Sequence, residues 1–262
     1  MKFPEHEKQR YETFVQEALD AAFQGWDFAY VNGYGSDVEE PLEWCYKNVV
    51  REYAADCSVL LDIGTGGGEF LASLQPLPAS TSATESYPPN IPVAKERLEP
   101  LGVKVFGIEE GRQEQYPLPF EGNFFDLVVS RHEGYESREL YRILKSGGTF
   151  ITQQVGRRNS ENLRMIFGSI EDADDFDWDL DHCRQFLADA GFTIVTAREH
   201  LGYSRFYDIR ALVYFMKALP WEFPGFDART QRRQLLNIYL KILQDGYFDV
   251  SSHRFFVIAR KV

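Results

Sequence analysis

The sequence is poor in cysteine, in basic charge and in long apolar runs. Its three cysteines, Cys45, Cys57 and Cys183, form no Cys-x-x-Cys pair, so the sequence indicates neither a disulfide framework nor a metal site. The N-terminus is polar and no apolar run approaches the ~18 residues of a membrane span. We therefore expect a cytoplasmic protein with neither a signal peptide nor a membrane partner.

The charge balance restricts the partners further. The chain has 40 Asp and Glu against 28 Lys and Arg, a formal net charge of −12. Affinity for nucleic acid depends largely on Lys and Arg contacts with phosphate. This composition therefore disfavours a nucleic acid as the main partner and favours a small molecule.

The length and composition fit one α/β domain with additions. The chain has 262 residues, 44% of them hydrophobic, which is enough for one sizeable core, and it contains no internal repeat or low-complexity linker. We expect an N-terminal helical cap (1–55), a core (56–199), a helical insertion (200–250) and a final strand (251–262). Apolar periodicity and turn residues predict helices at 5–23, 41–53, 178–190, 208–218 and 228–243, and strands at 192–197 and 254–259.

Residues 59–70 contain the strongest local signal. An apolar run ends at Asp62 and is followed by Gly64, Gly66 and Gly68 before a helix start. Such a strand, tight turn and helix let a nucleotide-like ligand lie against bare backbone, although a plain tight loop would show the same pattern. The NAD fingerprint requires a glycine where this chain has Glu69, and a carboxylate at the strand end suits an ammonium group better than a phosphate.

A second acid follows at the spacing used to bind a ribose. A strand predicted at 80–84 ends at Glu85, 23 residues after Asp62. In nucleotide-binding folds an acid about 20 residues on contacts the ribose hydroxyls. Glu85 is therefore a candidate ribose ligand, the alternative being a solvated acid after a strand.

The segments beyond Glu85 continue the pattern. A third strand is predicted at 103–108, and Leu118-Pro119-Phe120 leads through a turn into a fourth strand at 124–130. A helix, a glycine pair and a fifth strand follow over 139–154. With the glycine turn and the strand that ends at Glu85, these segments follow one another in a defined order over residues 58–155.

The motifs over residues 58–155 together resemble class I S-adenosylmethionine (SAM) dependent methyltransferases, and in particular the broad methyltransferase-11 group. The resemblance implies a doubly wound, mostly parallel, seven-stranded Rossmann-like sheet with helices on both faces and an antiparallel final strand. It also implies SAM as the cofactor and a small molecule as the methyl acceptor.

The resemblance assigns the cofactor-binding residues as well. It implies contacts from the first motif and from the ends of the second and fourth strands, namely Asp62, Gly64, Thr65, Gly66, Gly68, Glu85 and Ser130. The family's acid near the adenine has two counterparts here. Counting back from Leu118 selects Glu114, while counting forward from the third strand selects Glu110.

The fourth strand ends in residues suited to catalysis. His132 is the candidate general base because its ordinary pKa of about 6.5 allows proton exchange at neutral pH; a structural or cofactor-positioning role is the alternative. Arg131 could anchor a substrate carboxylate or pair with Glu133, and both are candidate substrate contacts. Strand alternation would turn one of Gln153 and Gln154 toward the same site.

Asp126, at the start of the fourth strand, is expected to have a structural hydrogen-bonding role. The reaction implied by the resemblance is SAM-dependent methyl transfer. Two alternatives from other classes are a SAM- or nucleotide-binding regulator without turnover and a dinucleotide oxidoreductase.

Overall fold

The structure is a computed structural model that describes residues 4–22, 37–108, 117–168 and 178–262. The chain divides into two compact units. One unit comprises Met1–Pro41, Arg157–Asp177 and Leu201–His253, and the other comprises Leu42–Gly156, Trp178–His200 and Arg254–Val262. The organisation of residues 1–262 as one methyltransferase domain stays a prediction. Within the described ranges, no helix combines the length and apolar character needed to cross a membrane.

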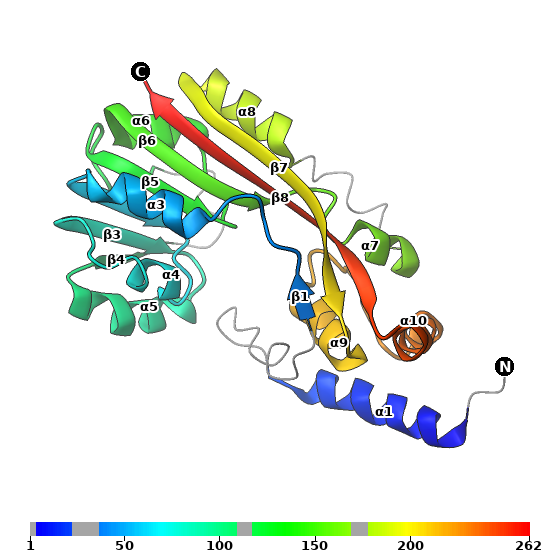
Figure 1. The fold of residues 1–262 in the computed structure, drawn as a ribbon. Coiled ribbons are helices and arrows are strands. Elements are labelled where there is room, and N and C mark those ends of the chain that lie inside the picture. The colour runs from blue at the N-terminus through cyan, green and yellow to red at the C-terminus, as the bar shows by residue number, and fades with distance from the viewer. Residues whose placement is uncertain (1–3, 23–36, 109–116, 169–177) are drawn as a thin grey trace. The chain divides into compact units, whose positions relative to one another are not determined.

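A mostly parallel sheet is the centre of the second unit (Figure 1). Its strands are β2 (Val59–Ile63), β3 (Ser80–Glu85), β4 (Lys104–Gly107), β5 (Phe125–Arg131) and β6 (Leu144–Val155), together with parts of β7 (Phe192–Phe206) and β8 (Phe248–Lys261). The order is β1-β7-β8-β6-β5-β2-β3-β4. Strands β2 to β6 pair in parallel, and β8 is antiparallel to β6, as expected for the final strand.

The predicted strand number was wrong. The described residues form eight strands, because β1 (Asp37–Glu39) pairs antiparallel with Ser204–Phe206 of β7. Strand β7 also continues well past its predicted end at residue 197. Pairing with β1 supplies backbone partners to this extension, and no local sequence signal announces such a distant partner.

Helices cover both faces of the sheet in the second unit. On one face lie α3 (Tyr46–Ala55), α4 (Glu69–Ala72) and α5 (Asn90–Leu98), which continues into the 3-10 helix η1 (Glu99–Leu101). On the other face lie α6 (Ser137–Ile143) and α8 (Leu180–Asp189). Successive strand residues point to opposite faces, so Leu60 packs in the core under α3, α4 and α5, and Leu61 packs in the core under α6 and α8. This arrangement confirms the Rossmann-like, doubly wound architecture.

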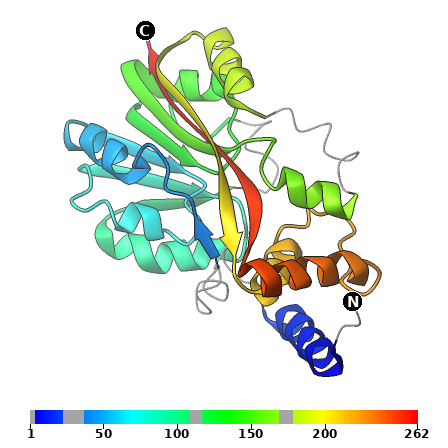
Figure 2. The ribbon, with the colours of Figure 1, turned by 45° about the vertical axis from the view of Figure 1, so that its right-hand side comes forward.

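The first unit has a helical core of its own (Figure 2). Its helices are α1 (Glu5–Asp20), α7 (Glu161–Phe167), α9 (Ile209–Ala218) and α10 (Arg232–Asp245). The ammonium group of Lys217, on α9, donates hydrogen bonds of 2.5–3.1 Å to the carbonyls of Ala18, Leu19 and Ala21. A helix end leaves such carbonyls without intrahelical partners, so Lys217 fixes the end of α1 to α9.

Asp126 connects three backbone segments of the second unit. Its carboxylate accepts hydrogen bonds from the amides of Ser58 (3.0 Å) and Val59 (2.9 Å) and from Lys145 Nζ (2.6 Å). Burial alone would raise the pKa of Asp126, but the bonds from Lys145 and the two amides outweigh it and lower the pKa. These contacts join the starts of β2, β5 and β6, as the expected structural role requires.

We predict that Asp126→Ala lowers the free energy of unfolding by about 1 to 3 kcal/mol, because charged hydrogen bonds are lost. Urea denaturation at pH 7 would measure the loss. The carboxylate has a lowered pKa in the folded protein, so its contribution is present above the unfolded pKa and disappears as the pH falls through the folded pKa. The exposed Glu121→Ala is the control and should change stability by less than about 0.5 kcal/mol.

Candidate functional site

The candidate site lies where the strand order of the sheet reverses. Strand β2 pairs with β3 on one side and with β5 on the other, and Ile63 lies opposite both Thr84 and Ser130. Ligands of open α/β sheets bind at the carboxyl ends of strands near such a reversal. The glycine turn, Glu85 and the segment after Ser130 therefore leave the sheet at one common edge.

The glycine turn has the backbone conformation that its sequence requires. Gly64, Gly66 and Gly68 have φ angles of +67°, +62° and +82°, a region in which other residues are strained. The amide of Thr65 donates to the carbonyl of Thr84 at 2.9 Å, which fixes the turn on β3. A Cβ added to Gly66 would meet no atom of the described residues within 4 Å, so these residues leave the backbone there open.

Glu133 lies against the first glycine of the turn. A Cβ added to Gly64 would come within 2.2 Å of the Cγ atom of Glu133. The carbonyl of Glu133 accepts hydrogen bonds from Ser130 Oγ (3.1 Å) and from Gln154 Nε2 (2.9 Å). The loop after β5 is thereby held beside the glycine turn.

Glu85 is a buried carboxylate that binds the turn directly. Its Oε2 accepts a hydrogen bond from the amide of Gly66 at 2.6 Å, and its Oε1 accepts one from the amide of Tyr87 at 2.8 Å. Burial raises the pKa of Glu85, while the two amides lower it. A carboxylate has about four acceptor positions, so Glu85 retains capacity for ligand hydroxyls.

Asp62 is nearly inaccessible, with 3% of its surface exposed. Burial raises its pKa to about 7. The Thr65 hydroxyl and the charge of Arg131 lower this pKa, and the charge of Glu85 raises it. Asp62 is therefore balanced between its neutral and ionised forms near neutral pH, and a nearby cation would favour ionisation.

Several buried polar side chains around the turn lack partners. Within the described residues, Thr84 Oγ1 and both polar side-chain atoms of Asn90 have no hydrogen-bond partner. Buried polar atoms nearly always have a partner in folded proteins. Thr84 and Asn90 are site candidates that the sequence did not reveal, because nothing distinguishes them locally from core residues.

His132 follows directly after β5 and has a φ of +60°. Its amide donates to the carbonyl of Gln153 at 2.9 Å, and its Nε2 lies 3.2 Å from Nε2 of Gln153. The residue as a whole is exposed. Protein atoms packed around the ring, followed by the charges of Arg254 and Arg131, lower the pKa of the imidazole well below its ordinary value. The general-base role of His132 stays a prediction.

The remaining predicted residues are distributed around this edge. Arg131 is exposed, with its guanidinium 5.1 Å from the centre of the Phe70 ring. Gln153 and Gln154 are both buried and hold the loop after β5 at different points, one at His132 and the other at the Glu133 carbonyl. The two candidate adenine contacts, Glu110 and Glu114, lie outside the described residues.

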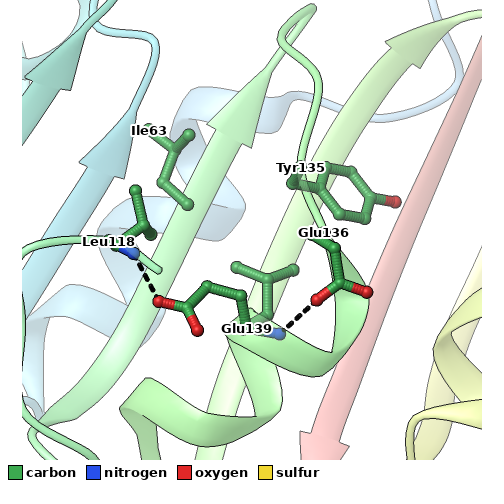
Figure 3. A pocket seen from close by; sticks show the side chains of 6 residues that line it. Ile63, Leu118, Tyr135, Glu136 and Glu139 are labelled. Carbon is green, nitrogen blue, oxygen red and sulfur yellow. Dashed lines mark hydrogen bonds between the residues drawn. The ribbon is translucent and has the colours of Figure 1, made fainter. Parts of the chain in front are cut away.

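A small cavity lies on the α6 face of the sheet (Figure 3). Its volume is about 10 Å³, and it is lined by Ile63, Leu118, Tyr135, Glu136, Glu139 and Leu140. A cavity of this size holds about one water molecule. The Glu139 carboxylate accepts from the amide of Leu118 at 2.5 Å, and that of Glu136 accepts from the amide of Glu139 at 2.6 Å. Both acids therefore stabilise backbone, and the cavity is far too small for a nucleoside.

The described part of the chain offers no cluster of three or more His, Cys, Asp or Glu residues arranged to hold a metal ion. The polar groups of the site are instead backbone amides, hydroxyls and the two acids Asp62 and Glu85. These groups suit an organic ligand that has hydroxyl and ammonium functions.

Comparisons with known proteins agree with this geometry. Residues 61–152 match a family model described as a methyltransferase domain. A comparison with curated proteins found no match. The matched residues run from β2 to β6 and so contain the glycine turn, Glu85 and His132.

Solved structures share the fold at low sequence identity. A proposed methyltransferase from Bacillus halodurans has a TM-score of 0.57 and 17% identity, covering 82% of this chain and 98% of its own. A proposed sarcosine dimethylglycine methyltransferase from Galdieria sulphuraria has a TM-score of 0.50 and 15% identity, covering 89% and 97%. The 4+2 cyclase SpnF has a TM-score of 0.51 and 17% identity, covering 97% and 94%. These likenesses show the fold alone.

The matched domain, on a Rossmann-like sheet with a glycine turn at its reversal point, defines a SAM-dependent methyltransferase. More particularly, the model that residues 61–152 match is that of the methyltransferase-11 group, and the cofactor is SAM. The predictions of the enzyme class and of the cofactor are confirmed.

We predict that Asp62 makes the folded protein less stable as the pH rises. Its folded pKa of about 7 exceeds the ordinary 3.8, so between these values the unfolded chain releases the proton that the folded chain retains. The free energy of unfolding should therefore fall across about pH 4 to 7 by up to a few kcal/mol, since one pKa unit corresponds to about 1.4 kcal/mol.

Urea denaturation across this pH range would compare the wild type with Asp62→Asn, which lacks the titrating group. The variant should gain stability relative to the wild type as the pH rises. The control Thr81→Val changes no ionisable group, so its stability difference should not vary with pH. A constant difference for Asp62→Asn would show that Asp62 does not retain its proton near neutral pH.

Proposed function

We propose that this methyltransferase transfers the methyl group of SAM to a small-molecule acceptor at the edge of the sheet formed by the ends of β2, β3 and β5. The observation that carries the proposal is the open backbone face at Gly66, which is flanked by the buried Glu85 carboxylate. A cofactor with ribose hydroxyls beside a flexible amino-acid portion fits this combination.

The residues around the turn fit SAM by their chemistry. Glu85 would accept hydrogen bonds from the ribose hydroxyls, and Asp62 would face the ammonium group, which favours its ionised form. Gly64, Gly66 and Gly68 would let the backbone approach the ligand, while Thr65 and Ser130 supply hydroxyls near it. Thr84 and Asn90 add buried polar atoms that have no partner within the described residues. When bound, SAM supplies an electrophilic methyl group, and the protein supplies alignment.

The acceptor side is formed by the segment after β5. Arg131 is the last residue of β5, the strand that pairs with β2, and His132 and Glu133 follow it. A net charge of −12 supports a small molecule over a polyanionic polymer as the acceptor. The shared fold does not identify the acceptor, because the structures that share it are named as a cyclase and as methyltransferases.

We predict that Gly66→Val abolishes SAM binding, because the new side chain would enter the space assigned to the ligand. Calorimetry with SAM would measure the affinity. The matched control is Gly102→Val. Gly102 also has a positive φ, of +82°, and among the described residues its added Cβ also meets no atom within 4 Å, but it precedes β4 at the opposite edge of the sheet.

Both glycine variants introduce the same kind of backbone strain, so both should lose stability. The control should keep its SAM affinity within about twofold, a difference of less than about 0.5 kcal/mol. Full SAM affinity in a folded Gly66→Val would place the cofactor elsewhere. Equal loss in both variants would show that strain, rather than occupied ligand space, removes binding.

The proposed function is tested by incubating the purified protein and methyl-labelled SAM with a metabolite extract and identifying labelled small molecules. Labelled products should form with the wild type and with Gly102→Val, and should be missing with Gly66→Val. Label found in nucleic acid or protein in place of a small molecule would refute the proposed acceptor class.

A further inference from the structure

Three side chains of the second unit form a polar chain that ends at His132. The indole Nε1 of Trp44 donates to Oε1 of Gln153 at 2.8 Å, and Nε2 of Gln153 lies 3.2 Å from Nε2 of His132. Trp44 and Gln153 are buried, with 8% and 7% of their surfaces exposed. The Trp44 ring also stacks on Phe256, with centroids 5.8 Å apart and an interplanar angle of 26°.

The donor and acceptor properties of these three side chains determine which imidazole nitrogen of His132 carries a proton. An indole N–H can only donate, so the amide oxygen of Gln153 must face Trp44. The amide NH₂ group of Gln153 then faces His132. An NH₂ group is a donor, so Nε2 of His132 must accept and cannot carry a proton. A neutral imidazole has its proton on one nitrogen, which places it on Nδ1.

The doubly protonated imidazole is also disfavoured here. It would direct a second N–H at the amide NH₂ group, and two donors would then oppose each other. The charged groups around the ring act in the same direction, because Arg131 from β5 and Arg254 from β8 are both positive. Within the described residues, Nδ1 of His132 makes no hydrogen bond.

We propose that Trp44 and Gln153 are positioning residues that hold His132 neutral with its proton on Nδ1, so that His132 offers the acceptor substrate a hydrogen-bond donor and not a base. The lone pair of Nε2 is occupied by Gln153, and Nδ1 carries a proton. Neither nitrogen can then remove a proton from the substrate.

This assignment rests on the proposed function for the identity of the substrate site, and it restricts the substrate class. The acceptor arrives already ionised, as a carboxylate or an acidic phenol or thiol. The lone pair of its anionic atom forms the new bond to the methyl carbon, and the electrons of the broken carbon–sulfur bond remain on sulfur. The anion becomes a neutral methylated product, and no proton is released.

The protonation state is measured directly by ¹⁵N NMR of the full-length protein with labelled histidine, without any substrate. The wild type should show a pyrrole-type signal for Nδ1 and a pyridine-type signal for Nε2 of His132 at pH 7. In Gln153→Glu, the carboxylate would accept from both Trp44 and Nε2, so the proton should move to Nε2 or both nitrogens should be protonated. A proton on Nε2 in the wild type would overturn the proposal.

A control is Gln154→Glu, which adds the same charge one residue further along β6; it loses the hydrogen bond to the Glu133 carbonyl but leaves the Gln153 amide beside His132 in place. It should leave the proton on Nδ1. If Gln153→Glu fails to fold, Trp44→Phe serves in its place, because loss of the indole donor lets the Gln153 amide turn over and should give a mixture of both tautomers. A folded Gln153→Glu or Trp44→Phe with the wild-type tautomer would also contradict the proposal.

The kinetic consequence separates positioning from simple structural damage. In Gln153→Glu the KM for an ionised acceptor should rise about 10- to 100-fold, the value of one hydrogen bond to a charged group, while SAM affinity stays unchanged. Acceptors with high pKa, such as aliphatic alcohols, should not be methylated by the wild type. Base-dependent methylation of such an alcohol, abolished in His132→Ala, would refute the donor role. If the wild type bound no SAM or methylated no acceptor, the proposed function would be refuted instead. The NMR result does not depend on that outcome, because it is measured without substrate.

Discussion

Parallel pairing of β2 with both β3 and β5 determines which groups meet at the site. Because the three strands run in one direction, their carboxyl ends reach the same edge, and the residue after each strand contributes to one locus. The hydrogen bond between the Gly66 amide and Glu85 then joins the ends of β2 and β3. The contact of Glu133 with Gly64 joins the ends of β2 and β5. If one of the three strands ran in the opposite direction, its carboxyl end would lie at the other edge of the sheet, a strand length away from this site.

The glycine turn and its acids could be predicted from the sequence because their chemistry is local. A positive φ selects glycine at Gly64, Gly66 and Gly68 whatever surrounds them. Asp62 is one residue from the end of β2 and Glu85 ends β3, and parallel strands bring their carboxyl ends together. The antiparallel final strand was predicted from the family resemblance and not from local chemistry.

The parts that escaped prediction depend on distant partners. The contact between Trp44 and Gln153 joins residues 109 positions apart, and nothing near either residue announces it. Strand β1 and the extension of β7 likewise exist because they pair with each other. His132 could be identified from its position as a candidate base or positioning residue, but its contact with Gln153, and through Gln153 with Trp44, could not be predicted from the sequence.

The site also concentrates negative charge where little water reaches. Burial raises the pKa of both Asp62 and Glu85. The charge of Glu85 raises the pKa of Asp62 further, whereas backbone amides lower the pKa of Glu85. The folded protein thus contains acids whose charged forms are incompletely compensated. A ligand with a positive group and hydroxyl donors supplies the missing compensation, which links cofactor affinity to the same electrostatics that reduce stability.

The contact between Gly64 and Glu133 has a consequence for redesign of the enzyme. The side chain that borders the acceptor segment also covers the first glycine of the cofactor turn. Residue libraries at Glu133 would therefore change cofactor and acceptor recognition together, and selection for a new acceptor would be confounded by altered cofactor use.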